Sequence, residues 1–158
     1  MSTLIARVDE VLIPFLRRWS TPALRVSLAV VFIWFGALKI VGLSPVVELV
    51  ASTVYWVDPD WFVPALGVIE VLVGVGLAVG RALRLVLLVL ALQMTGTFLV
   101  FVILPDVAFQ GGNPFNLTVT GEFVIKNLVL LAAAMSVGAS LESRGALNAN
   151  RAESRSSA

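Results

Sequence analysis

Residues 61–79 read WFVPALGVIEVLVGVGLAV, an apolar run that holds a single ionisable side chain, Glu70. A helix rises 1.5 Å per residue, so about 20 apolar residues cross a hydrocarbon core of ~30 Å. Three further stretches have the same character, at residues 22–41, 83–104 and 123–139. In lipid each segment must satisfy its own backbone polar groups, and these runs are too long and continuous for barrel strands. The sequence therefore predicts an all-α fold, an integral membrane four-helix bundle.

The composition supports a membrane protein and excludes several functions. The chain is 59% hydrophobic and 13% charged, whereas soluble domains are roughly 45–50% apolar and about 25% charged. The excess apolar surface is expected to face the lipid bilayer. A net charge of +1 with dispersed bases argues against nucleic acid. The chain has no Cys and no His, which excludes dithiol chemistry and the commonest zinc and haem sites. We therefore predict no metal and no intrinsic cofactor.

The chain divides into three predicted segments. Residues 1–20 place apolar side chains at helical spacing and are expected to form an amphipathic helix on the cytoplasmic membrane surface, with a frayed tail as the alternative. Residues 21–140 form the four-transmembrane-helix domain. Residues 141–158 are polar and rich in Ser, Ala and Arg, which predicts a disordered cytoplasmic tail.

The distribution of Arg predicts the orientation. Every Arg lies before or at the start of the first span, in the connection at Arg81 and Arg84, or after the fourth span. The connections at residues 42–60 and 105–121 carry acidic residues and no Arg. Basic residues favour the cytoplasmic side. We expect both termini in the cytoplasm.

The two outer connections have different characters. Residues 42–60 contain a short helix-like run that should lie in the membrane interface, and they lead into an aromatic group of Tyr55, Trp56 and Trp61. Residues 105–121 are rich in Gly, Asn and Pro and should form an irregular cap over the bundle.

Few polar side chains lie inside the spans, and such residues are candidates for a functional site. Counting 1.5 Å per residue places Glu70 and Gln93 both near the midplane. Lys126 and Lys39 are closer to the outer boundary. We expect Glu70 in the bundle interior, close to Gln93 and within reach of Lys126, in a polar pocket open toward the outer face. Gly residues one turn from Glu70 and Lys39 would let the helices approach closely.

Each of these polar residues has an alternative role. Lys39 either points inward or extends to the outer head groups. Lys126 either reaches the interior or pairs with Glu122 at the helix end. A contact from Glu70 to Lys126 or Gln93 would also be explained by a purely structural role.

Three stretches resemble one family of membrane proteins. They are RVSLAVVFIWFGALK at residues 25–39, GVIEVLVG at 67–74 and GEFVIKNLVLL at 121–131. Together they resemble the DoxX-like superfamily of small four-helix membrane proteins, and within it the YkgB-type branch, over about residues 22–140. The family often has Lys-Asp in the fourth span, whereas this chain has Lys126-Asn127 and so lacks that charge.

The resemblance implies a multi-pass protein of the bacterial inner (cytoplasmic) membrane. Some relatives look like membrane subunits of quinone-linked sulfur oxidation or of oxidative-stress assemblies. Lys39, Glu70 and Lys126 correspond to the family's polar positions, and Arg25 corresponds to an anchor at the inner surface. The predicted ligand-binding set is Glu70, Gln93, Lys126, Lys39 and Trp34.

Three functions fit these observations. The favoured one is a non-catalytic membrane subunit or binding protein for a quinone, a lipid or a similar apolar molecule, with soluble or membrane protein subunits as expected partners. The second is a quinone-dependent oxidoreductase subunit in which Glu70 shuttles a proton and Lys126 stabilises an anionic oxygen. The third is a small transporter that acts as a homo-oligomer. No intrinsic redox or hydrolytic motif is present, so a non-catalytic role ranks first.

Overall fold

The computed structural model is all-helical over the residues it describes, namely the backbone of residues 2–156 and the side chains of residues 9–141. In chain order the elements are α1 (Ser2–Ile40), α2 (Val47–Thr53), α3 (Pro59–Val79), α4 (Leu83–Thr97), α5 (Val100–Ile103), α6 (Pro105–Ala108), η1 (Gln110–Gly112), α7 (Val119–Ile125) and α8 (Asn127–Ser156). Within the described backbone the one β-type pairing is an isolated bridge from Phe109 to Leu117. The all-α prediction is confirmed.

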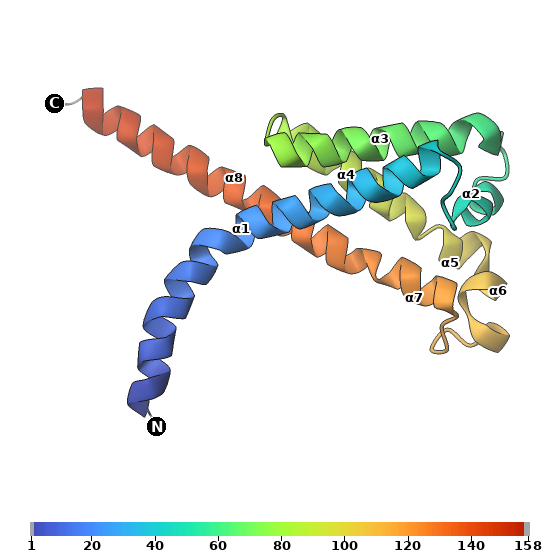
Figure 1. The fold of residues 1–158 in the computed structure, drawn as a ribbon, viewed down its shortest axis with the longest axis horizontal. Helices are drawn as coiled ribbons and strands as arrows, with labels where there is room; N and C mark the ends of the chain where they lie inside the picture. The colour runs from blue at the N-terminus through green and yellow to red at the C-terminus, as the bar shows by residue number, and fades with distance from the viewer. Residues whose placement is uncertain (1, 157–158) are drawn as a thin grey trace.

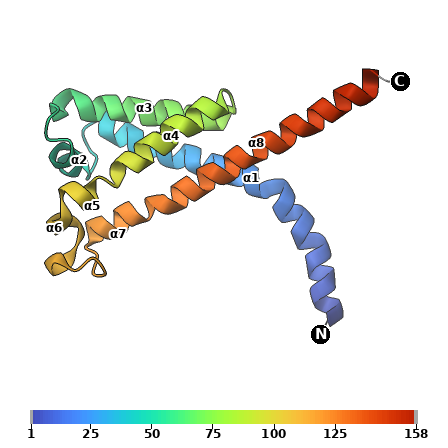
Figure 2. The same cartoon turned by 180° about the vertical axis from the view of Figure 1, so that it is seen from behind.

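Four helical stretches are long and apolar enough to cross a membrane. They are Asp9–Ile40, Pro59–Val79, Leu83–Ile103 and Val119–Leu141. The third combines α4 with α5, and the fourth combines α7 with the first part of α8. Figures 1 and 2 show these helices packed as one bundle, with α8 crossing α1. The predicted four-helix membrane bundle is therefore confirmed.

The N-terminal part of α1 turns away from the bundle (Figure 1). It belongs to the same helix as the first span, because α1 is continuous from Ser2 to Ile40. Pro22 lies inside this helix, where a proline removes one backbone hydrogen bond and favours a bend. Phe15 and Trp19 are exposed on this arm. Docking of residues 1–20 on a membrane surface stays a prediction, and the side chains of residues 1–8 lie outside the described ones.

The backbone of α8 continues as helix to Ser156. The disordered tail predicted for residues 141–158 falls almost entirely on residues whose side chains lie outside the described ones, and it stays a prediction.

Two glycines bring α1 and α3 unusually close together. A Cβ atom added at Gly36 would lie 2.6 Å from the Gly67 carbonyl oxygen, and one added at Gly67 would lie 2.7 Å from the Gly36 carbonyl oxygen. No larger residue fits at either position without a shift of backbone. This contact sets the separation of the two helices at the level of the polar residues.

The apolar core lies between the long helices. Buried residues from α1, α3, α4 and α8 form its larger part: Leu28, Ala29, Phe32, Val73, Leu77, Leu90, Met94, Ala133, Ala134 and Val137. A smaller cluster of Val100, Ala108 and Val124 lies under the second outer connection. Large apolar side chains such as Leu72, Leu85 and Leu92 are exposed on the outside of the bundle, where they meet the lipid.

The connections at residues 42–60 and 105–121 have the local structure expected from the sequence, and their place at the outer membrane interface stays a prediction. Helix α2 is the helix-like run expected within residues 42–60. Tyr55, Trp56 and Trp61 are exposed, as an interfacial aromatic group requires. The second connection consists of α6, η1 and irregular chain. It is tied down by Thr118, whose hydroxyl accepts from the Gly121 N–H at 3.1 Å and donates to the Val107 carbonyl at 2.5 Å.

Candidate functional site

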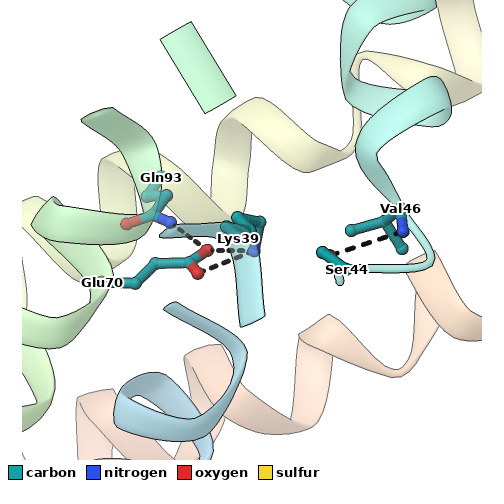
Figure 3. A network of polar contacts seen from close by, with 5 residues as sticks. All are labelled: Lys39, Ser44, Val46, Glu70 and Gln93. Atoms are coloured by element: carbon teal, nitrogen blue, oxygen red, sulfur yellow. Dashed lines mark hydrogen bonds and ion pairs between the residues drawn. The ribbon is translucent and has the colours of Figure 1, made fainter. Parts of the chain in front are cut away.

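A buried ion pair joins α1 to α3. Lys39 Nζ donates to both carboxylate oxygens of Glu70, at 2.7 Å each. Both residues are buried, with 7% of Lys39 and 5% of Glu70 exposed. Figure 3 shows the Lys39 nitrogen at the carboxylate of Glu70. A pair so far from water is held by direct hydrogen bonds between charged groups, which are among the strongest in proteins.

Gln93 of α4 completes the polar network. Its Nε2 donates to Glu70 Oε1 at 2.6 Å, so the Glu70 carboxylate accepts three hydrogen bonds in all. Gln93 Oε1 is buried and has no hydrogen-bond partner in the described part of the chain. The amide therefore donates one of its two N–H groups to Glu70, and its oxygen has no partner among the described residues (Figure 3).

The local sequence explains why these side chains meet. Gly36 precedes Lys39 by three residues, and Gly67 precedes Glu70 by three, so in each helix the glycine and the charged residue share one face. The added Cβ at Gly36 would meet Glu70 Cβ at 2.8 Å, and the added Cβ at Gly67 would meet Lys39 Cβ at 2.9 Å. The close glycine contact therefore positions each charged residue against the opposite helix.

A cavity of about 130 Å³ lies beside the ion pair. Its polar lining consists of Lys39, Glu70, Thr97 and Asn127, and Asn127 Nδ2 donates to Thr97 Oγ1 at 3.0 Å. The remaining lining is apolar: Val31, Phe32, Phe35, Val46, Leu49, Met94, Val100, Phe123, Val124 and Leu130. An apolar cavity of roughly 150 Å³ holds one benzene molecule. This cavity can therefore take one ring or a short length of alkyl chain.

The first outer connection forms part of the cavity wall. Val46 precedes α2 and Leu49 lies in it, and both line the cavity. Ser44 is buried nearby, and its Oγ lies 3.5 Å from the Val46 N–H (Figure 3). The cavity thus lies at the end of the bundle where the α1–α3 connection crosses. That this end faces outward stays a prediction.

Three of the predicted site residues come together in the structure. Glu70 is buried in the bundle interior and bonded to Gln93, as the sequence predicted. Of the two roles left open for Lys39, the inward one is found: its side chain is 8% exposed and bonded to Glu70. Extension of Lys39 to the outer head groups is therefore wrong.

The prediction that Lys126 reaches Glu70 is wrong. Lys126 is exposed and pairs with Glu122 at 3.5 Å, with 69% of its side chain accessible. It lies at the junction of α7 and α8, where its neighbour Asn127 faces the cavity instead. The acidic group four residues earlier on the same helix face is closer than any interior carboxylate, so the local pair forms.

Trp34 also lies away from the cavity. It is 67% exposed on the outside of α1, whereas the adjacent Phe35 lines the cavity. The helical rotation of about 100° per residue accounts for this difference.

Sequence reasoning missed Thr97 and Asn127 as lining residues. The available signal was helical spacing: Asn127 follows buried Val124 by three residues and precedes the cavity-lining Leu130 by three. That places Asn127 on the inward face of the fourth span.

The chain matches the model of one protein family. The DoxX family model matches residues 21–103, which include Lys39, Glu70 and Gln93 and end before Asn127. The match does not single out the YkgB-type branch. No curated protein and no solved structure matches the chain.

Proposed function

This chain belongs to the DoxX family, and from that premise we propose that it is a non-catalytic binding protein for an apolar molecule with a hydrogen-bonding head group, such as a quinone or a lipid. The ligand's ring or alkyl segment would occupy the cavity beside Glu70. Its head group would meet Lys39 and Glu70, which line the cavity.

The main support for this proposal is a buried, hydrogen-bonded ion pair, Lys39 with Glu70, in the wall of a mostly apolar cavity. An ammonium group has three N–H donors, and the two bonds to Glu70 account for two of them. The third donor suits a carbonyl oxygen of a bound molecule. Asn127 and Thr97 offer further polar atoms across the cavity. Apolar walls with a few convergent polar groups are typical of ligand sites.

The quinone-dependent oxidoreductase ranks lower. A proton shuttle needs a carboxylate that can release and recapture a proton, yet both Glu70 oxygens accept bonds from Lys39. Lys126, the expected oxyanion stabiliser, lies outside the cavity in a pair with Glu122. The contacts around Glu70 therefore favour binding over catalysis. No observation favours the transporter.

We place the protein in a bacterial inner membrane, with both termini in the cytoplasm. The distribution of Arg supports this orientation. The proposal includes partner subunits, soluble or in the membrane, that use the same ligand. It also includes assembly of several copies of this chain.

The experiment is native mass spectrometry of the protein released from mild detergent. Wild type is compared with Leu130→Phe, which adds volume at a residue that lines the cavity, and with Leu128→Phe, which makes the same change at an exposed position of the same helix. Wild type and Leu128→Phe should retain a quinone or lipid mass that Leu130→Phe loses. A wild type that is empty, or a mass retained equally by all three, would contradict the proposal.

A further inference from the structure

A second cavity lies at the opposite end of the bundle, where the first span begins. It has a volume of about 100 Å³ and is lined by Thr21, Pro22, Arg25, Leu83, Val137, Ser140 and Leu141. It shares no lining residue with the cavity beside Glu70. Three helices contribute to it: α1, α4 and α8.

Arg25 is the one charged residue in this lining. Among the side chains that the structure describes, Arg25 makes no hydrogen bond or ion pair, and its Nε is buried without a partner. A buried donor left unsatisfied is costly, more so on a charged group. Arg25 Nε can therefore take an acceptor that the described side chains do not supply.

The fold holds the guanidinium group in place. A Cβ atom added at Gly80 would lie 3.0 Å from Arg25 Nη1 and 3.4 Å from Cζ, so the group packs directly against this glycine. Gly80 adopts φ +77° and caps the C-terminus of α3, where the helix dipole favours a cation. Glycine thus provides both the left-handed turn and the space for Arg25.

Further groups suit an anion at this position. The Thr21 hydroxyl makes no hydrogen bond within the described side chains and is free to donate, whereas the Ser140 hydroxyl already donates to the Val137 carbonyl at 2.7 Å. Arg81 and Arg84 flank the lining residue Leu83, and both are exposed. These two residues add positive charge at this end of the bundle.

We infer that this cavity binds the phosphate group of an anionic phospholipid in the leaflet on the side of the chain termini. The planar fork of Arg matches two phosphate oxygens at once, and Thr21 would donate to a third. Leu83, Val137 and Leu141 supply apolar surface for the adjoining glycerol and acyl carbons. Basic pockets between transmembrane helices are known sites for such head groups.

The test measures thermal unfolding of the full-length protein in detergent with added phosphatidylglycerol or phosphatidylcholine. Phosphatidylglycerol should raise the Tm of wild type well above the value with phosphatidylcholine. Arg25→Gln should lose this increment. Arg18→Gln, which removes the same charge from an exposed position on the same helix, should keep most of it.

Two further variants distinguish specific binding of phosphate from a general effect of positive charge. They also serve if Arg25→Gln fails to fold. Arg25→Lys retains the charge but loses the fork, and Thr21→Val removes one donor while leaving Arg25 intact. Each should show a reduced phosphatidylglycerol increment, so the inference remains testable if Arg25→Gln does not fold.

Three results would overturn the inference. A wild type that responds equally to both lipids has no anionic site. If Arg25→Gln and Arg18→Gln lost the phosphatidylglycerol-dependent rise in Tm equally, the rise would come from general attraction between basic residues and anionic lipid. A rise of the same size with soluble glycerol 3-phosphate would assign the cavity to a free anion instead of a lipid.

Discussion

Lys39 Nζ lies 2.7 Å from Glu70 Oε2, and the two residues are 31 positions apart in the chain. The pair therefore joins the end of the first span to the middle of the second. Both side chains are almost inaccessible from outside the protein, so their direct hydrogen bonds hold the pair together.

Removal of one member of this pair should strongly destabilise the protein. Lys39→Met leaves the Glu70 carboxylate buried without its counter-ion, and loss of one partner of a buried pair costs about 3–5 kcal/mol. Glu70→Leu should be similarly harmful, because Lys39 is then unpaired. The free energy of unfolding in mixed micelles measures both effects.

The double variant Lys39→Met/Glu70→Leu should recover most of that loss, because an apolar pair of similar volume carries no charge to desolvate. The matched control is the exposed pair of Glu122 and Lys126, where Lys126→Met should change stability by only about 0–1 kcal/mol. A double variant as unstable as the sum of the single ones would show that the charges do not act as a pair.

The close approach of α1 and α3 gives a second prediction. Gly67→Ala places a methyl group 2.7 Å from the Gly36 carbonyl oxygen, and overpacking of this kind costs about 1–3 kcal/mol. The helices should separate, and ligand retention should fall with the free energy of unfolding. Gly96→Ala is the control, since a Cβ there meets nothing within 4 Å. Equal stability of the two variants would mean that the glycine contact does not hold the helices together.

Membrane orientation is tested by cysteine labelling in intact cells, made simple by a chain without native Cys. Asp58→Cys and Asn113→Cys lie in the two outer connections and should react with an impermeant maleimide. Arg81→Cys lies between α3 and α4 and should react only after permeabilisation. External labelling at position 81 would reverse the topology.

The helical spans could be predicted well because lipid imposes a simple rule on length and composition. The predicted starts and ends of the second and third spans, such as Trp61 against the observed Pro59, differ from the structure by at most two residues. The continuity of α1 was less predictable. Residues 1–20 and 22–41 were expected as two separate helices, but α1 passes through Pro22 and only bends (Figure 1).

The sequence predicted the depth of the candidate site in the membrane, but it did not predict which lysine pairs with Glu70. Residue counting placed Glu70 and Gln93 at one level, and they are bonded. It could not choose between Lys39 and Lys126, because depth along the membrane does not give rotation about the helix axis. The rotation of α1 is set by Gly36 against Gly67, a contact between spans that no single segment reveals.

The charge of Glu70 should matter to the ligand separately from its effect on stability. Glu70→Gln retains the shape and one acceptor for Lys39 but removes the counter-charge. We expect a folded protein, recovered from the membrane at lower yield, that retains less ligand than wild type in native mass spectrometry. Glu122→Gln, the same change on the exposed outer pair, should retain ligand normally. Equal retention in both variants would remove Glu70 from the site.

The most direct test of the binding site is photoaffinity labelling in proteoliposomes with a quinone that carries a diazirine on its ring, followed by mapping of the adducts. We expect adducts on cavity-lining residues of α4 and α8, above all Met94 and Leu130. Excess unlabelled short-chain quinone should abolish these adducts. Adducts confined to the lipid-facing side chains Leu85, Leu92 and Leu128, unaffected by competitor, would contradict this prediction.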